Sequence, residues 1–505
     1  MSHELNMTRL LSERPRRAVL ECGSDELIES VARLLEAGFR LALVGARHDE
    51  AVIEIVYLFV DGPPDQRIEL QVLLDARQPR IPSIAHLNYS ASRFEREMYD
   101  LFGVQPIGHP QLRRLVLHQH WPRGWHPMRH DAGPQPSMNA DADAFPFAPV
   151  EGPGIYEIPV GPVHAGVIEP GHFRFWVLGE TIVRMKARLW FVHKGIERLF
   201  EGRDLDFALN LAEKISGDSA VSHSLAFVQA VEEALGVEVG PRANELRAVL
   251  LELERLYNHV ADVGALCNDV GFGLANARAL TLRERLLTLN DSVTGHRLLR
   301  GGVHYGGATL RTLPTREELE DIATQFHELV ALARSNSIVM DRFTGTGVLT
   351  IDQARDLGVL GVVARASGLH DDARVSQPFV ELPASFHRVT RDVGDVLSRF
   401  EVRCDEVDVS LRLLADLVSR EGPLDVRGDE VEIREGHGTG IAEGWRGAVV
   451  HRVHFGPGGI LSRVKIVDPS FFAWPALPLA LSDTIVPDFP LVNKSFNLSY
   501  AGNDL

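Results

Sequence analysis

Residues Glu245–Asn268 read ELRAVLLELERLYNHVADVGALCN, the most informative segment of this sequence for its architecture. Apolar residues recur in it at helical spacing and form one broad stripe, which predicts a long helix with one face in a core. Stretches 278–299, 316–340 and 392–417 have a similar helical character. Several long helices with few strands between them predict a bundle-like helical core. The stripe consists of Leu246, Val249, Leu250, Leu253, Leu256, Tyr257, Val260 and Val263.

The chain before this helical half has a different pattern. Residues 25–37 have helical spacing and end at Gly38, a residue type that favours helix termination. Three apolar or β-branched runs at 39–44, 52–60 and 68–74 are separated by Gly, Pro and Asp, which predicts strands. We therefore expect a small α/β-sandwich domain in the N-terminal part of the chain.

A Pro- and Gly-rich stretch divides the two patterns. Residues 131–154 have the composition of an extended linker. A strand pair is expected next, at 156–159 and 173–178, joined by a loop rich in Gly, His and Pro. The tail 467–505 is rich in Pro and aromatic residues and has no helical period. The predicted fold class is α+β, with domains at 1–130 and 155–505, the second mainly α-helical with a small antiparallel sheet at its start.

The composition limits the classes of function. The 505 residues have a formal net charge of −17, so no basic surplus is present for a nucleic-acid partner. The three cysteines form no C-x-x-C pair, which argues against a disulfide framework or a four-thiolate cluster within the chain. The N-terminus has no apolar signal region, and no apolar run approaches the ~20 residues of a membrane span. We expect a cytoplasmic chain held at a membrane only through other subunits.

Two short strings in the N-terminal part point to a family. EREMYDLFG at 95–103 and GHPQLRR at 108–114 resemble the signature of the 30-kilodalton-type subunit of complex I. Taken alone, the first string is also compatible with an exposed amphipathic helix followed by a turn. The resemblance implies a structural segment whose charges dock against the neighbouring quinone-site subunit.

Longer strings in the second part resemble the 49-kilodalton quinone-site subunit of complex I. The similarity is greater still to the large subunit of group 4 nickel–iron hydrogenases of the formate hydrogenlyase type, in which both modules are fused. The strings are GPVHAGVIEPGHFRF at 161–175, FVHKGIER at 191–198, ELERLYNH at 252–259, RASG at 365–368, DPS at 468–470 and PLVNKSFNLSY at 490–500.

The hydrogenase resemblance implies four cysteine ligands that this sequence lacks. A nickel–iron centre needs four thiolates, because soft anionic sulfur holds both metals. Ser216 and Ser219 stand where the first pair of cysteines is expected, and Ser470 and Ala473 stand where the second pair is expected. We therefore predict that no nickel–iron centre is present.

The quinone site of complex I is also incomplete by resemblance. Gly217, followed by Asp218, stands where that family has a tyrosine that donates to the quinone. His164 remains in the loop between the two expected strands, with His172 later in the same loop. His164 or His223 could supply the donor instead.

Several polar residues remain around the predicted pocket, each with a structural alternative. By resemblance, Glu169 could deliver protons, but it could equally be a solvated loop acid. Asp269 could act in the pocket or merely cap a helix. Arg446 resembles the arginine over the metals of hydrogenases, but it could instead pair with Glu443. His259 is better explained as a helix-surface or satisfied core histidine. The predicted catalytic residues are Glu169, His164, His223, Asp269, Arg446 and Asp468, and the predicted cofactor-binding residues are His164, His172, Ser216, Gly217, Ser219 and Ser470.

The resemblance implies a subunit of a membrane-associated oxidoreductase on the inner face of the cytoplasmic membrane. Electrons would come from a 4Fe–4S cluster in a small partner subunit and pass to a quinone or another small acceptor, with coupling to proton translocation. Membrane-anchor and antiporter-like subunits would be further partners, and no cofactor would be tightly bound in this chain. The alternative is a structural, coupling subunit without redox chemistry of its own.

Overall fold

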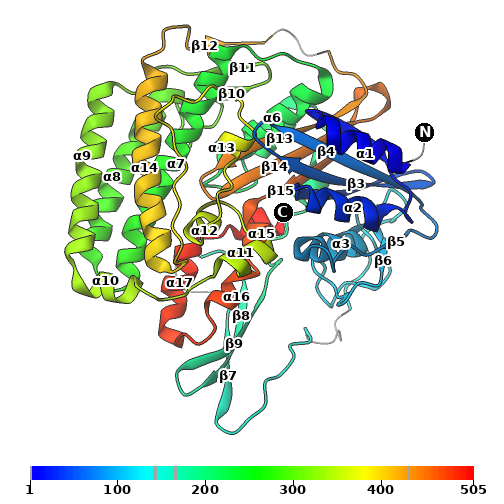
Figure 1. Ribbon diagram of the computed structural model, residues 1–505, viewed down its shortest axis with the longest axis horizontal. Coiled ribbons are helices and arrows are strands. Elements are labelled where there is room, and N and C mark those ends of the chain that lie inside the picture. Colours follow the sequence, from blue (N-terminus) through cyan, green and yellow to red (C-terminus); the bar gives the residue numbers. More distant parts are fainter. Residues whose placement is uncertain (1–2, 140–144, 164–167, 429–431) are drawn as a thin grey trace.

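The computed structural model describes residues 3–139, 145–163, 168–428 and 432–505 (Figure 1). Long helices lie side by side at one end of the molecule, and an N-terminal region with a sheet and flanking helices lies at the other. Helices and strands both contribute to the fold, and the largest of the sheets belongs to the N-terminal region. The predicted α+β class is therefore confirmed.

A four-stranded sheet forms the centre of the N-terminal region. Its strand order is β1–β4–β3–β2, in which β1 and β4 are parallel and the other neighbours are antiparallel. The predicted helix and three strands are confirmed, and Gly38 follows the helix with φ +93°. The elements are α1 (His3–Glu13), β1 (Arg17–Glu21), α2 (Leu27–Glu36), β2 (Arg40–Asp49), β3 (Val52–Asp61) and β4 (Gln66–Asp75).

Helix α3 (Tyr89–Phe102) carries the first family string and is largely buried. Its Glu95 is fully buried and accepts hydrogen bonds from the Ser83 hydroxyl at 2.6 Å and the Ile84 N–H at 2.7 Å. The interpretation of this string as an exposed amphipathic helix is therefore wrong. A short parallel pair, β5 (Arg80–Pro82) and β6 (Gln105–Ile107), flanks the helix.

The strand pair predicted after the linker is a three-stranded antiparallel sheet. Strand β7 (Ile155–Val160) pairs with β8 (His172–Leu178), and β8 pairs with β9 (Thr181–Arg188). These strands extend from the body of the molecule in Figure 1.

Helix α7 (Pro241–Asp269) is the centre of the helical part and contains the segment ELRAVLLELERLYNHVADVGALCN. It contacts α6 (Ala220–Leu235), α8 (Gly273–Thr294) and α14 (Val396–Val418). Figure 1 shows α7, α8 and α14 running alongside one another. The apolar stripe of α7 is buried, as its spacing predicted.

The helix predicted at 316–340 is two helices, α9 (Arg316–Ser335) and α10 (Ser337–Phe343). Asn336 between them is extended, and its side chain accepts hydrogen bonds from the N–H groups of Ile338 and Val339. An asparagine that caps the following helix ends the preceding one, because its own backbone leaves the helical conformation.

A second antiparallel sheet, which the sequence did not predict, packs on α6. The sheet was not predicted because its first strand is rich in glycine. Gly440 lies so close to α6 that a Cβ atom would come within 1.9 Å of the Ala226 carbonyl oxygen. Such close approach requires glycine, a residue that otherwise argues against a strand. The strands are β13 (Gly436–Gly444), β14 (Gly447–Phe455) and β15 (Leu461–Val467).

Charged contacts join the N-terminal region to the helical part. Arg93 of α3 donates hydrogen bonds to the Phe471 carbonyl and to Asn503 Oδ1, the second at 3.0 Å. Lys465 of β15 pairs with Glu97 of α3 at 2.6 Å. Helix α3 therefore docks on the second part of the chain through its charged residues.

The remaining elements are short. The tail, which showed no helical period, contains four of them as helices, each too brief for a periodic pattern to emerge. They are α4 (Ile196–Phe200), α5 (Leu205–Ala212), β10 (Val303–His304), β11 (Gly307–Thr309), α11 (Ile351–Leu357), α12 (Gly361–Ala366), α13 (Ala373–Ser376), β12 (Asp425–Val426), the 3₁₀ turns Pro457–Gly459 and Val486–Asp488, and in the tail α15 (Pro469–Ala473), α16 (Ala476–Ala480), α17 (Phe489–Phe496) and α18 (Tyr500–Asp504).

A buried charge cluster ties α7 to its neighbours. Arg374 contacts Asp372 at 2.7 Å and Glu406 of α14 at 2.8 Å. Arg365 of α12 contacts Glu443 of β13 at 2.9 Å. Each charge needs its partner, because an unpaired charge in such a site is costly. The cluster consists of Glu252, Arg255, Arg365, Asp372, Arg374, Glu406 and Glu443, all at most 5% exposed.

Replacing Arg374 by glutamine is expected to lower the free energy of unfolding by about 3–5 kcal/mol, since two buried carboxylates lose their shared partner. The matched control is Arg355→Gln, because Arg355 pairs with Asp352 where the two side chains are 59% and 80% exposed. That change should cost less than about 1 kcal/mol. Urea unfolding followed by circular dichroism measures both. Equal losses in the two variants would contradict a structural role for the cluster.

Candidate functional site

Two segments far apart in the sequence meet at the predicted pocket. Ser216 Oγ lies 2.8 Å from Ser499 Oγ, and the Ser499 N–H donates to Ser470 Oγ at 2.9 Å. All three serines are at most 3% exposed. The fold therefore brings one residue from each predicted cysteine pair to a common neighbour, Ser499. Ala473 is buried one turn further along α15.

Helix α7 holds the turn that contains Ser216, Gly217 and Ser219. The Asp218 carbonyl accepts hydrogen bonds from Asn258 Nδ2 at 2.8 Å and Trp445 Nε1 at 2.9 Å. This accounts for the position of the turn directly before α6. Gly217 faces open space, with no atom within 4 Å of where a Cβ would lie.

Arg446 and Asp218 form the main charge pair of the site. The guanidinium donates to both Asp218 carboxylate oxygens, at 2.7 and 2.8 Å, and its Nε donates to the Asn497 carbonyl at 2.6 Å. The alternative in which Arg446 pairs with Glu443 is wrong, since Glu443 is engaged by Arg365. Burial acts to raise the pKa of Asp218, but the charge and hydrogen bonds of Arg446 outweigh burial and lower it.

A second polar chain runs from Asp468 into the protein. His223 Nε2 lies 3.2 Å from Asp468 Oδ2, and His223 Nδ1 lies 3.0 Å from His451 Nε2. The three side chains are almost fully buried. Burial and the neighbouring His223 hold the pKa of His451 well below its ordinary value, so His451 is neutral at pH 7. Both ring nitrogens of His223 are thus engaged, and neither is free to donate to a quinone.

Asp468 also organises the second segment. Its Oδ1 accepts the Ser470 N–H at 2.7 Å and caps α15. Burial acts to raise the pKa of Asp468, but hydrogen bonding and charge from His223, the charge of Arg446 and the Ser470 contact together lower it. The carboxylate is therefore ionised at neutral pH.

Three contributing residues escaped the sequence-based prediction: Asn497, Ser499 and Asp262. Asn497 Nδ2 donates to Asp262 Oδ1 at 2.7 Å, and Arg403 pairs with the other Asp262 oxygen at 2.9 Å. Asn497 and Ser499 belong to the family string PLVNKSFNLSY, which was the available signal. Nothing in the sequence pattern pointed to Asp262.

Other predicted residues lie outside this constellation. Asp269 is exposed at the last position of α7, and the next helix is capped by Phe272, so Asp269 does not cap it. His172 Nδ1 lies 3.1 Å from the Gly161 carbonyl oxygen. Glu169 is exposed and accepts a hydrogen bond from the Ala501 N–H at 3.2 Å. His164 lies outside the described residues.

His259 lies in the core, as one of the two predicted alternatives had it, but it differs from that alternative in its hydrogen bonding. The side chain is completely buried, and neither ring nitrogen has a hydrogen-bond partner among the described residues. Burial, followed by the charges of surrounding arginines such as Arg255, lowers its pKa well below the ordinary value. The ring is therefore neutral and packs edge-to-face with Trp445 at 6.1 Å between centroids.

The arrangement does not fit a nickel–iron centre. The four predicted ligand positions offer three hydroxyls and one methyl group in place of four thiolates. The hydroxyls of Ser216 and Ser470 are both hydrogen-bonded to Ser499. The three cysteines of the chain are buried elsewhere as free thiols. Within the described ranges, no group of three His, Cys, Asp or Glu side chains is arranged to hold a metal ion.

Three family models match successive parts of the chain. Respiratory-chain NADH dehydrogenase, 30 Kd subunit, matches residues 20–137, and nickel-dependent hydrogenase matches residues 194–266. Respiratory-chain NADH dehydrogenase, 49 Kd subunit, matches residues 269–427. The fold and site therefore define a protein of the class shared by complex I and the large subunits of nickel-dependent hydrogenases.

Comparison with individual proteins makes the assignment narrower. Formate hydrogenlyase subunit 5 of Escherichia coli is 33% identical, over 86% of this chain and 79% of its own length. Hydrogenase-4 component G of the same organism is 32% identical, over 88% and 80%. The chain belongs to the family of these two proteins, which confirms the resemblance inferred from the sequence strings.

Two further similarities agree with this family. The C/D subunit of the NADH-quinone oxidoreductase of Bacteroides thetaiotaomicron is 28% identical, over 78% of this chain and 79% of its own length. Among solved structures, the membrane-bound sulfane sulfur reductase, an archaeal respiratory membrane complex, contains a chain with a TM-score of 0.63 and 25% identity. That similarity covers 70% of this chain and 99% of the other. In the described part of the chain, no helix has the length and apolar character needed to cross a membrane.

Replacing Asp468 by asparagine is expected to lower the free energy of unfolding by about 2–3 kcal/mol at pH 7, because charge-assisted hydrogen bonds in a buried site are lost. The folded-state pKa lies below the ordinary 3.8. The stabilisation by the Asp468 carboxylate is therefore complete at pH values above the ordinary 3.8, and it disappears as the pH falls through the folded-state pKa.

Urea unfolding at pH 7 and at pH 3 measures this dependence. Asp352→Asn, at an exposed pair, is the matched control and should change the free energy of unfolding by less than about 0.5 kcal/mol at either pH. A destabilisation by Asp468→Asn that stays constant between the two pH values would argue against an ionised carboxylate.

Proposed function

We propose that this chain is the subunit of a membrane-associated, complex I-like oxidoreductase that passes electrons from a partner's 4Fe–4S cluster to a small acceptor. The acceptor is a quinone or a carrier of similar size, and the chain is not a functional hydrogenase. The observation that carries the proposal is the hydrogen-bonded serine set at the predicted thiolate positions, Ser216–Ser499–Ser470. The family fold is retained while the means of holding nickel and iron is absent.

The space in front of Gly217 supports an acceptor at this place. Gly217 is exposed, and a Cβ atom added at this position would have no neighbour within 4 Å. The Arg446–Asp218 pair lies beside it, with Arg446 stacked on Trp445 at 3.8 Å from the ring centroid. An arginine in this position would favour the negative charge that develops on a carbonyl oxygen during reduction.

Proton supply to the acceptor is assigned to side chains around the same turn. Asp468, His223 and His451 form a continuous hydrogen-bonded chain that ends beside the serines. Glu169 lies against α18, near Ser499, through its contact with the Ala501 N–H. We assign Glu169 the exchange of protons with solvent, because its side chain is exposed.

The proposed partners follow from the family. A small subunit with a 4Fe–4S cluster would supply electrons, and membrane-anchor and antiporter-like subunits would hold the complex on the inner face of the cytoplasmic membrane. Coupling to proton translocation belongs to the same proposal.

The second candidate function is a structural, coupling subunit without redox turnover. The observation that favours it is the complete engagement of the site's own groups. Both nitrogens of His223 have partners, and Asp218 neutralises Arg446. A site that satisfies itself in this way does not require a ligand.

Substitution at Gly217 distinguishes the two candidates. In the purified complex with its neighbouring subunits, Gly217→Trp is expected to reduce quinone-analogue turnover by about tenfold or more, because the indole fills the space assigned to the acceptor. Gly217→Ala is the matched control and should retain turnover within about twofold, since a methyl group meets open space. The free energy of unfolding of both variants should lie within about 0.5 kcal/mol of the wild-type value.

Absence of turnover in the wild-type complex, together with no effect of Glu169→Gln on any coupled activity, would favour the structural function. Metal analysis of the same preparation provides an independent measurement. One nickel atom per chain would contradict the assignment of Ser216, Ser219 and Ser470 as non-ligands.

A further inference from the structure

A cavity separate from the serine site is lined by several positively charged side chains. It has a volume of about 350 Å³ and lies between α3, β9 and the start of α16. No carboxylate among the described residues lines it. Its cationic residues come from two elements, and on each element they share one face. On α3, Arg93 and Arg96 are one turn apart. On β9, every second residue is a cation: Arg184, Lys186 and Arg188.

The arginines of this cavity are held by neutral groups. Arg96 donates to the carbonyl oxygens of Arg113 and Arg114, at 2.9 and 3.0 Å. Arg188 donates to the Leu115 and Leu117 carbonyls, the second at 3.4 Å. Carbonyl groups fix the guanidinium positions without cancelling their charge. The cavity therefore keeps a concentrated positive charge.

One buried donor points to a missing ligand. Arg188 is 4% exposed, and its Nε has no hydrogen-bond partner among the described residues. A buried N–H without a partner is destabilising, and more so in a charged group. Lys186 supports the same conclusion. Partial burial of its side chain, followed by the charges of Arg96, Arg184, Arg113 and Arg93, lowers its pKa, although the residue as a whole remains exposed.

The nearest carboxylates are engaged elsewhere. Asp100 accepts hydrogen bonds from three consecutive backbone N–H groups, starting with Leu115 at 2.7 Å. Glu97 pairs with Lys465, and Asp504 accepts the Val192 N–H at 3.0 Å. None of the three forms an ion pair with a cation of the cavity within the described part of the chain.

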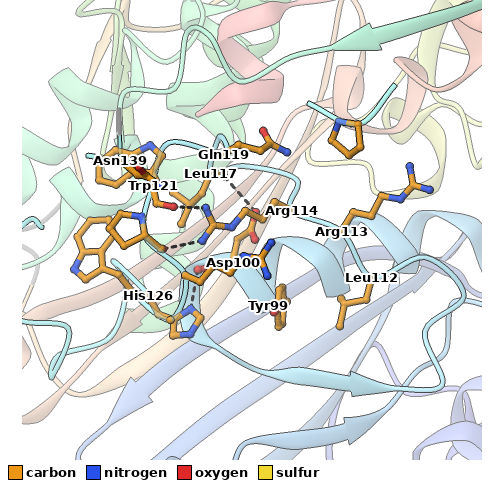
Figure 2. A pocket seen from close by; sticks show the side chains of 15 residues that line it. Tyr99, Asp100, Leu112, Arg113, Arg114, Leu117, Gln119, Trp121, His126 and Asn139 are labelled. Carbon is orange, nitrogen blue, oxygen red and sulfur yellow. Dashed lines mark hydrogen bonds between the residues drawn. The ribbon is translucent and has the colours of Figure 1, made fainter. Parts of the chain in front are cut away.

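The larger cavity of the N-terminal region, of about 470 Å³, differs in this respect (Figure 2). There the Arg114 guanidinium donates hydrogen bonds to three backbone carbonyls, those of His118, Trp121 and Pro122. Figure 2 shows the neighbouring Arg113 pointing in the opposite direction. The groups in Figure 2 hold a loop in place, whereas Arg184 and Lys186 of β9 form no hydrogen bond or ion pair with the described residues.

We propose that the cavity between α3 and β9 binds the phosphate group of an anionic ligand, either a phospholipid headgroup or a free phosphorylated small molecule. Arginine and lysine side chains that converge without a carboxylate are the usual means of holding a phosphate. The rim carries apolar side chains with partial exposure, Val183 at 42% and Leu479 at 39%. These would contact the uncharged part of the ligand. The proposal is independent of the redox chemistry at the serine site.

The test measures binding of inorganic phosphate to the full chain by equilibrium dialysis at low salt. The double variant Arg184→Ala/Lys186→Ala removes two exposed cations of the cavity, so the fold should be retained. We expect binding to weaken by about tenfold or more, since hydrogen bonds to charged groups are lost. The matched control, Arg297→Ala/Arg316→Ala, removes two exposed cations from the helical part and should bind within about twofold of the unmodified chain.

Flotation with phosphatidylglycerol or phosphatidylcholine vesicles identifies the source of the phosphate. Flotation with phosphatidylglycerol vesicles but not with phosphatidylcholine vesicles, reduced by added free phosphate, supports a lipid headgroup. Phosphate binding without flotation supports a soluble phosphorylated ligand. Equal phosphate binding by both double variants, or none by the unmodified chain, would overturn the proposal, as would stronger competition from poly-glutamate than from pyrophosphate.

The chain's own acids provide one more discriminating variant. Asp141 and Asp143 precede Phe145, which lines the cavity, and they lie outside the described residues. If phosphate binds only after Asp141→Asn/Asp143→Asn, the cavity serves an intramolecular contact and the proposal is wrong. Unchanged affinity in that variant supports an external ligand.

Discussion

The buried cluster around Arg255, Arg365 and Arg374 is the constraint on which the helical part of the chain depends. Its charges come from α7, α12, the start of α13, α14 and β13, and each contacts at least one partner on another element. Arg255 also donates to the carbonyls of Glu443 and Gly444, at 2.6 and 3.1 Å. These residues directly precede the turn that carries Arg446. Because moving one element would leave a buried charge without its partner, the cluster fixes the position of Arg446 as well as the packing of α7.

The consequence for the site is a family-like geometry with altered chemistry. The turn before α6 and the start of α15 meet, as the hydrogenase resemblance requires, but hydroxyls meet there instead of thiolates. Hydroxyls at neutral pH are protonated donors and acceptors, and they satisfy one another through Ser499. The positive charge of Arg446 is balanced by Asp218 rather than by a bound metal cluster and its ligands. The Arg446–Asp218 pair is therefore neutral as a whole, while the ionised Asp468 adds a negative charge to the site.

Helix α15 connects this pocket to the cationic cavity. Its first residues place Asp468 and Ser470 in the site, while its Phe471 carbonyl accepts a hydrogen bond from Arg93, which lines the cavity. Arg93 therefore lines the cavity and also contacts the helix that begins at the site. Docking of α3 on the second part of the chain depends on the same arginine. The N-terminal region thus contributes to the environment of the site, although none of the site residues described above belongs to it.

The sequence by itself determined the family, the α+β class, the long helices and the absence of cysteine at the predicted ligand positions. These features depend on local period or on residue identity, both of which are readable along the chain. It missed the sheet β13–β15, because Gly438 and Gly440 are required by contact with α6 and not by any strand propensity. It also missed Asp262 and the lack of a hydrogen-bond partner for His259 among the described residues. Only the tertiary structure decided which carboxylate pairs with Arg446, since Asp218 and Glu443 are equivalent in chemistry and differ only in where the fold places them.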